Sequence, residues 1–223
     1  MILRKYGIKL RSLGVHDLEL LRKKRNSSFV RNRMVYQEEI SQKQQLEWYK
    51  NLDPATNLYL IIENNDTSCG LINIKNINPD TGNSESGLFI WKEDLTRSHL
   101  PVLASWLLSE TGYGIAGGPG TEIKVLKSNN SAIEFNKKMG FNITREENDI
   151  VFMYQSKKSF SEATRSSRER FLQGRKEGHE IDLSFNDHEN DDFILANFLK
   201  LTDQHKDLRK TISDRHYSFT ITF

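Results

Sequence analysis

Cysteine is almost absent from this chain, because Cys69 is the one cysteine among 223 residues. A single cysteine excludes an internal disulfide and any zinc site built from several cysteines. Cys69 opens a short apolar run, residues 69–72, so we expect a buried, structural thiol. The 6 histidines are not spaced as metal ligands, and no metal site is expected.

Long hydrophobic runs and a strong charge of one sign are also lacking. No stretch of about 18 apolar residues occurs, so no membrane span is expected. The first residues lack the apolar core of a signal peptide. The formal net charge of +2 is too small to indicate a nucleic-acid partner. We therefore expect a soluble, cytoplasmic protein that binds neither nucleic acid nor membranes.

The length of 223 residues suits one domain of ordinary size with an appendage. Residues 1–156 alternate between strand-like and helix-like patterns, which predicts the order β-α-α-β-β-β-α-β-α-β-β. Strands are expected at 8–13, 57–63, 69–77, 84–91, 122–126, 141–144 and 150–155. Helices are expected at 17–25, after a Ser41 cap, at 99–111 and after Asn129. The glycine-rich residues 112–120 are expected to form a flexible loop.

Residues 157–223 differ in composition, and we treat them as a C-terminal extension. Residues 157–179 are rich in Ser, Arg, Lys and Glu and predict an exposed helix or linker. An amphipathic helix is expected over 193–201, and the alternation of 217–223 suggests a closing strand. The extension carries no recognisable chemistry. We expect it to pack against the main domain or against a second subunit, which would make a homodimer.

The segment 129–141 is the most informative part of the chain. Its apolar residues Ala132, Ile133, Phe135 and Met139 fall on one face at helical spacing. Asn129 or Asn130 can cap the start of the helix, and Gly140 stands where a closing glycine is expected. Taken alone, the pattern also suits any β-α-β unit with a capped helix.

This segment resembles the N-x-x-A-x-x-F-x-x-x-x-G-F motif of the GCN5-related N-acetyltransferases, the GNAT family. The predicted element order is also that of the family, so the resemblance covers about two-thirds of the chain. It implies an α+β, three-layer GNAT fold with a mixed, mostly antiparallel sheet flanked by helices. It also implies acetyl-CoA as co-substrate, with Asn129, Asn130 and Phe135 among the residues that contact it.

The strand beginning at Glu85 resembles the fourth strand of the family, where Glu-x-Gly-x-x-Ile is common. The resemblance implies that backbone N–H groups of Phe89, Ile90 and Trp91 bind the acetyl carbonyl and the pantetheine arm. Glu85 would lie near the acceptor pocket, where a partly desolvated carboxylate has a raised pKa and can act as general base. The alternative is a solvated strand residue.

The pyrophosphate loop departs from the family pattern, because no Gly-x-Gly precedes the helix at 99–111. Arg97, Ser98 and His99 could still supply N–H groups and positive charge to the phosphates. Many relatives place a tyrosine after the Phe135 equivalent to protonate the departing thiolate, and Asn136 stands there instead. An amide can bind a thiolate but cannot protonate it.

The N-terminal region is similar to the N-acetyltransferases that act on UDP-4-amino-4,6-dideoxy sugars in the synthesis of pseudaminic and legionaminic acids, which belong to surface polysaccharides. Arg25 and Arg31 suit a nucleotide diphosphate, whereas Asn26 and Gln37 suit sugar hydroxyls. Met34 could line a wall for the sugar or the base. The basic residues at this helix end could equally serve the helix dipole and solvation.

We therefore predict an acetyl-CoA-dependent N-acetyltransferase that acts on a nucleotide-linked amino sugar by direct attack of the amine. Cys69 has no base partner in the sequence pattern, which disfavours an acyl-enzyme. One alternative is an acetyltransferase for protein N-termini, like those that modify ribosomal proteins. Another is a degenerate, non-catalytic GNAT domain that serves as a binding module.

Overall fold

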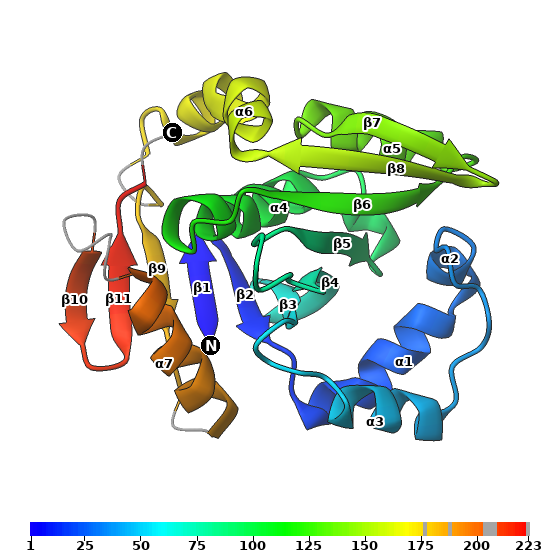
Figure 1. The fold of residues 1–223 in the computed structure, drawn as a ribbon, viewed down its shortest axis with the longest axis horizontal. Coiled ribbons are helices and arrows are strands. Elements are labelled where there is room, and N and C mark those ends of the chain that lie inside the picture. The colour runs from blue at the N-terminus through cyan, green and yellow to red at the C-terminus, as the bar shows by residue number, and fades with distance from the viewer. Residues whose placement is uncertain (176–177, 187–188, 203–208, 222–223) are drawn as a thin grey trace.

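The computed structural model describes residues 1–175, 178–186, 189–202 and 209–221 (Figure 1). One sheet of 11 strands runs through these residues in the order β10-β11-β9-β1-β2-β3-β4-β5-β6-β8-β7. The strands are β1 (Ile2–Lys5), β2 (Ile8–Ser12), β3 (Leu58–Asn64), β4 (Thr67–Lys75), β5 (Ser84–Ile90), β6 (Gly120–Leu126), β7 (Asn142–Glu147), β8 (Ile150–Ser156), β9 (Ile181–Ser184), β10 (Arg209–Ser213) and β11 (His216–Phe219). The helices are α1 (Leu18–Asn26), α2 (Ser28–Arg31), α3 (Gln42–Lys50), α4 (Leu100–Glu110), α5 (Asn130–Lys138), α6 (Lys157–Leu172) and α7 (Glu189–Thr202).

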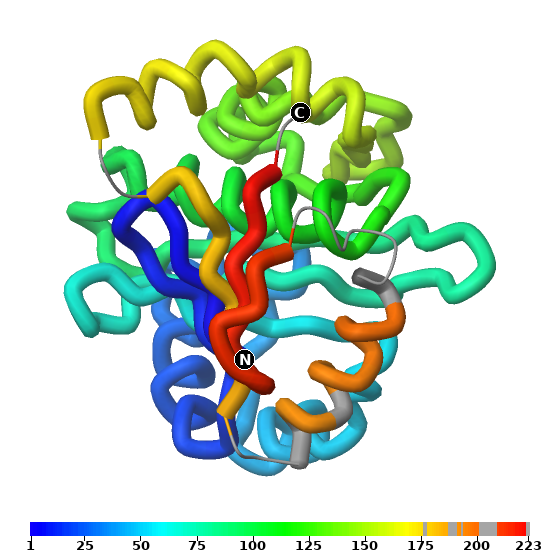
Figure 2. The backbone as a smooth tube through the Cα atoms, turned by 90° about the vertical axis from the view of Figure 1, so that its left-hand side faces the viewer, coloured from blue at the N-terminus to red at the C-terminus, as the bar shows by residue number. Residues whose placement is uncertain are grey.

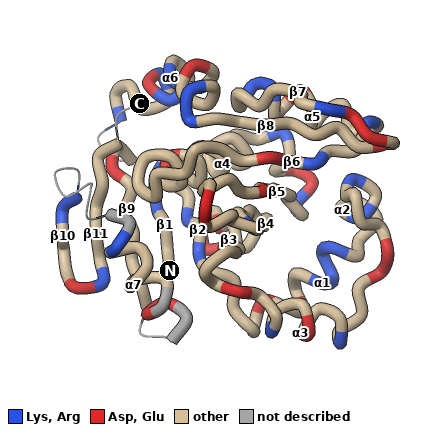
Figure 3. Tube along the Cα trace, viewed as in Figure 1, with Lys and Arg blue, Asp and Glu red and all other residues tan. Residues whose placement is uncertain are grey.

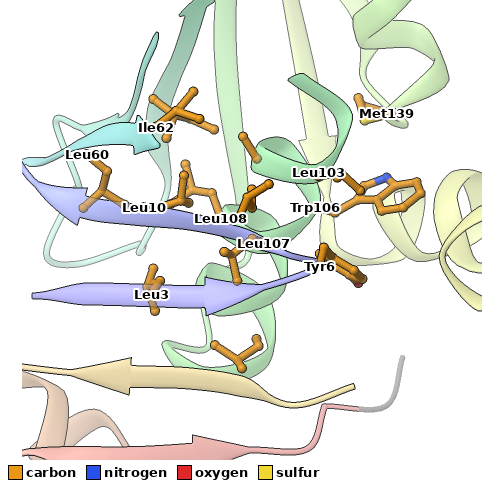
Figure 4. Packing of buried hydrophobic residues seen from close by; sticks show 14 of the residues in the cluster. Leu3, Tyr6, Leu10, Leu60, Ile62, Leu103, Trp106, Leu107, Leu108 and Met139 are labelled. Atoms are coloured by element: carbon orange, nitrogen blue, oxygen red, sulfur yellow. The ribbon is translucent and has the colours of Figure 1, made fainter. Parts of the chain in front are cut away.

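Helices cover both faces of the sheet, which makes the three layers. Alternate residues of a strand point to opposite faces, and the buried residues follow that rule. Ile61 and Leu71 pack in a cluster with residues of α1, α2 and α3. Leu60 and Ile62 belong to a larger cluster with α4 and α5. Figure 4 shows Leu107 and Leu108 of α4 facing the strands that carry Leu3 and Leu10.

The mixed, mostly antiparallel sheet flanked by helices confirms the expected fold class. The order of elements over 1–156 is as predicted, with α2 and one extra strand, β1, added. β1 has only 4 residues and pairs with β2 through a tight turn in which Tyr6 and Gly7 have φ of 59° and 79°. Such a short strand leaves little periodicity to detect, and its pairing with β2 and β9 holds it in the sheet.

The glycine-rich segment departs from the expectation of a flexible loop. Residues Thr111–Ile115 continue α4 as a π-helical turn, and Tyr113 and Ile115 are buried. The Tyr113 hydroxyl donates to the side-chain oxygen of Gln155 at 2.8 Å. The first half of the segment is therefore part of the core.

The extension continues the central sheet and shares its core. β9 pairs antiparallel with β1, β11 pairs with β9, and β10 pairs with β11. Ile181, Leu183 and Phe219 are almost fully buried in the α4-side cluster. Figures 1 and 2 show these strands beside β1, with α7 packed over them. The expected closing strand is β11, and its predicted last residue, Phe223, lies outside the described residues.

A buried ionic cluster ties α6 of the extension to the rest of the fold. Glu110, at the end of α4, is 1% exposed and accepts hydrogen bonds from Lys5 at 2.9 Å, Tyr6 at 2.8 Å and Arg168 at 2.7 Å. The helix predicted to be exposed is therefore amphipathic, since α6 also buries Phe160 and Thr164 beside Arg168. Within the described residues, no helix is long and apolar enough to cross a membrane.

Candidate active site

The sheet opens between its two parallel strands, β5 and β6. They pair only at Ser84 with Thr121 and at Glu85 with Glu122. Beyond these residues β5 runs on to Ile90 along β4, and β6 runs on along β8. The two strands therefore separate, and one edge of β5 has backbone groups without a neighbouring strand.

Successive backbone amides of a strand point to opposite edges, and this alternation determines which β5 amides face the opening. The Trp91 amide donates to the Cys69 carbonyl on β4 at 2.9 Å. Because amides of an antiparallel pair alternate in direction, the Phe89 amide also faces β4. The amides of Leu88 and Ile90 face the opening. The prediction is therefore wrong for the amides of Phe89 and Trp91, and it overlooked Leu88.

The helix after β6 has the predicted ends. The Asn129 side chain accepts from the Ala132 amide at 3.2 Å and from the Ser131 hydroxyl at 3.0 Å. Gly140 closes the helix with a φ of 91° and lies under the backbone of Ser159. Both predicted caps are confirmed. Asn130 is exposed on the first turn of α5.

Phe135 and its neighbour Asn136 lie further along α5. The Phe135 ring is half-buried and packs against the α4-side core. The Asn136 amide donates to the Ala132 carbonyl at 2.8 Å and lines a cavity beside the opening. Its identity leaves no proton donor at the position where relatives carry tyrosine. Tyr113 does not substitute, because burial raises its pKa and its hydroxyl is bound to Gln155.

The turn before α4 has features of an anion site. The Ser98 hydroxyl accepts from the Leu100 amide at 3.1 Å, which caps the first turn, and Pro101 follows there as expected. In the described part of the chain, the amides of Arg97 and His99 make no hydrogen bond. Free amides at a helix start, together with the exposed Arg97 side chain, can bind phosphate oxygens.

Glu85 lies on the α1–α3 face of β5, where the two strands separate. Its carboxylate is 3.0 Å from Lys124 Nζ and 3.4 Å from Lys75 Nζ, and it accepts from Asn76 at 3.0 Å. Burial raises the pKa of Glu85, but the hydrogen bonds from Lys124 and Asn76 and the two lysine charges outweigh it. The net pKa lies below its usual range, so the expected raised pKa is wrong.

Polar groups around Glu85 come from strands that sequence reasoning did not connect. Asn73 on β4 lies against Gly87, and its buried Oδ1 accepts no hydrogen bond from any described residue. Tyr59 on β3 stacks edge-on against Trp48 with ring centres 4.9 Å apart. The charge of Glu85 contributes to a raised Tyr59 pKa, behind burial as the main cause. The side chains therefore share one face of the sheet, which the alternation of strand residues could have indicated.

The predicted acceptor residues divide by role. Asn26 exchanges two hydrogen bonds with the Ile40 backbone, at 2.8 and 2.9 Å, so it fixes the loop before α3. The predicted contact with a sugar stays a prediction. Arg25 is half-buried and donates to the Tyr36 carbonyl. Its Nη1 is buried without a hydrogen-bond partner among the described residues, and burial lowers its pKa. No described carboxylate pairs with Arg25.

The other predicted acceptor residues follow on α2 and the loop after it. Arg31 is half-buried and forms no ion pair within the described ranges. Met34 packs against the α1–α3 cluster, and Gln37 is exposed. Figure 3 shows Lys and Arg gathered along α1 and on α2. In the described part of the chain, no group of three His, Cys, Asp or Glu side chains could hold a metal ion.

Solved structures that share this arrangement of strands and helices include proteins named as N-acetyltransferases. FdhC, a nucleotide-linked sugar GNAT, is 20% identical with a TM-score of 0.65, over 77% of this chain and 98% of that chain. Spermidine N-acetyltransferase from Vibrio cholerae, in complex with CoA and spermine, is 17% identical with a TM-score of 0.61, over 69% and 98%. Campylobacter jejuni N-acetyltransferase PseH is 20% identical with a TM-score of 0.52, over 68% and 99%.

These similarities show that the chain has the GNAT fold. No family model matches the sequence, and no curated protein sequence matches it. The part of the chain that the solved structures do not cover is comparable in length to the extension, which widens the sheet by β9, β10 and β11.

Proposed function

We propose that this protein is an acetyl-CoA-dependent N-acetyltransferase whose acceptor is a nucleotide-linked amino sugar. The observation that carries the proposal is the separation of β5 from β6 beyond Glu85 and Glu122, with the amides of Leu88 and Ile90 facing the opening. Fixed backbone donors of this kind stabilise the oxyanion of acyl transfer. The neighbours include a protein described as a nucleotide-linked sugar GNAT and another solved with CoA.

The chemistry needs a neutral amine and a polarised thioester. The amine nitrogen attacks the acetyl carbonyl, and a tetrahedral oxyanion forms against one of the two amides, that of Leu88 or that of Ile90. The C–S bond then breaks, and the proton lost by the amine ends on the thiol of the released CoA. The turn at Arg97 and His99 would hold the pyrophosphate. Cys69 is unsuited to an acyl-enzyme because it is 1% exposed and burial raises its pKa.

Glu85 is suited to a role that does not need a raised pKa. Its carboxylate is ionised at neutral pH and can accept a hydrogen bond from the acceptor amine or from a bridging water. Lys75 and Lys124 beside it disfavour a further positive charge, so they lower the pKa of an ammonium group bound nearby. A larger share of the acceptor is then neutral and nucleophilic.

Arg25 supports an anionic acceptor. Arg25 is half-buried, burial lowers its pKa, and no carboxylate among the described residues neutralises its charge, so a phosphate group on the acceptor would be a favourable partner for the exposed part of the guanidinium. A spermidine-like polycation would meet repulsion there. A peptide N-terminus remains the second acceptor class, and Arg25 does not favour it because most peptides lack phosphate.

The first test is calorimetric titration with acetyl-CoA, followed by CoA release with UDP-linked amino sugars. Saturable micromolar binding and sugar-dependent release are expected. Absence of binding at millimolar acetyl-CoA would leave a GNAT fold without the activity, and the binding-module alternative would take its place. Release that depends only on peptides would refute the sugar acceptor.

Two variants test the assigned groups. Arg25→Gln removes a charged hydrogen bond, so the KM for the UDP sugar should rise about tenfold or more while acetyl-CoA binding is unchanged. Arg33→Gln is the matched control, since Arg33 is exposed and lies over the Phe29 ring. Glu85→Gln should lower kcat and change its pH profile. An unchanged kcat would remove Glu85 from the mechanism.

A further inference from the structure

A large apolar cavity lies on the α4 face of the sheet. Its volume is about 640 Å³, within the roughly 300–1,000 Å³ typical of small-molecule sites. The mostly apolar walls come from β4, β5, β6, α4 and the residue before β7. They include Ile72, Ile74, Leu88, Leu108, Ile123 and Phe141. A space of this size in a folded domain is unusual, because interiors are close-packed.

The cavity is continuous with the opening between β5 and β6. Gly87 and Leu88, which lie just beyond the last paired residues of β5, line it together with Asn136. Asn136 stands where GNAT relatives place the group beside the departing thiol. A thioester held at the Leu88 and Ile90 amides would therefore have its acyl group at the mouth of the cavity.

Small side chains keep this mouth open. Ser84 and Ser86 of β5 line the cavity, and so do Gly120 and Thr121 of β6. Larger residues here would separate the opening from the cavity.

The extension closes the far side of the cavity. Leu183 of β9 and Ile194 and Phe198 of α7 contribute to its walls. Phe198 is itself anchored among Phe185, Tyr217 and Phe219, with ring centres 5.5–5.7 Å away. Without this layer the apolar surface on β4 and β5 would lie open to solvent. The extension thus converts a sheet face into a partly enclosed apolar chamber.

We propose that this chamber holds the acyl chain of the donor, so that the protein uses acyl-CoA thioesters with chains longer than acetyl. The inference rests on the acyl-transfer function proposed above and extends its donor. The step is unchanged: the amine N–C bond forms, the thioester C–S bond breaks, and the proton lost by the amine ends on the CoA thiol. The added methylene groups take no part in the reaction and bind in the chamber.

Calorimetry with CoA, acetyl-CoA, butyryl-CoA and hexanoyl-CoA tests the proposal on the full chain. Each methylene that enters the chamber should tighten binding by up to about fourfold. Equal affinity for all four ligands, or weaker binding of the longer ones, would overturn the chamber assignment and leave acetyl transfer intact. Failure of CoA itself to bind would overturn both proposals.

A filling variant makes the test specific to the chamber. Ser105 of α4 lines it, so Ser105→Phe should remove the advantage of hexanoyl-CoA while CoA binds as in the unmodified protein. Ser166→Phe, on the exposed face of α6, is the matched control and should change neither. Ser109→Leu fills the same space from the next turn and serves if Ser105→Phe does not fold. An equal loss for CoA and hexanoyl-CoA would refute the proposal.

Discussion

Replacement of Glu110 by glutamine should destabilise the fold strongly. The carboxylate is 1% exposed and compensates two buried cations, Lys5 and Arg168, at 2.9 and 2.7 Å. Glutamine keeps the shape and can still accept a hydrogen bond, but it removes the negative charge that faces the buried Lys5 and Arg168 side chains. Because the cluster joins β1, α4 and α6, the loss affects the attachment of the extension to the core.

The magnitude follows from the cost of an uncompensated buried charge. Removal of one partner of a buried ion pair costs about 3–5 kcal/mol, against a total stability of about 5–15 kcal/mol. Tyr6→Phe removes one hydrogen bond to the same carboxylate and leaves its charge partners in place, so it should cost only about 1 kcal/mol. The comparison separates charge from hydrogen bonding.

Urea unfolding followed by tryptophan fluorescence measures the difference. With a slope of about 1–3 kcal/mol per molar urea, the midpoint of Glu110→Gln should fall by at least about 1 M. Glu19→Gln is the control, since the more exposed Glu19 pairs with Arg22 within one helix and its loss should change the midpoint little. A midpoint for Glu110→Gln no lower than that for Tyr6→Phe would refute the argument.

Three further predictions concern local geometry, acid stability and the extension. Gly140→Ala places a Cβ 2.4 Å from the Ser159 carbonyl at a φ of 91°, so it should cost more than about 1 kcal/mol in urea unfolding. Burial raises the pKa of Asp17, but hydrogen bonds from Arg11 and the Gly14 amide lower it by more, so the net pKa of Asp17 is below its usual value. The stabilisation of the fold by ionised Asp17 is present at neutral pH and is lost as the pH falls through the folded-state pKa of Asp17. Arg11→Met should therefore make Tm depend less on pH in the acid range. Deletion of 157–223 should abolish cooperative unfolding in near-UV circular dichroism, because it uncovers β1 and the shared core.

The order of helices and strands in the main domain could be predicted from local sequence patterns. Ser41 forms a capping box with Gln44, and Asn129 and Gly140 bracket α5, as their residue types predict. β9 was missed because only two of its residues, Ile181 and Leu183, are buried. Its strand state comes from pairing with β1, almost the whole chain away, which no local pattern records.

The candidate active site was also only partly predictable, because contacts between distant segments leave no local pattern in the sequence. The position of Glu85 on a strand was predictable, but its pKa depends on Lys75 and Lys124 from the two neighbouring strands. Those neighbours follow from strand order and register, which residue spacing alone does not give. The error over the Phe89 and Trp91 amides has the same origin, since the direction of an amide is set by the partner strand.

The widened sheet also ends in a particular way. In the part of the chain that the structure describes, its outer strands are β10 and β7, and both are mostly exposed. Each shows a shift of register, near Ser213 and near Arg145, and each carries charged side chains. Irregular, charged borders resist the addition of a foreign strand. The strands added beside β1 therefore give the sheet a new, irregular edge, which should keep neighbouring copies of the protein from pairing edge to edge at high concentration.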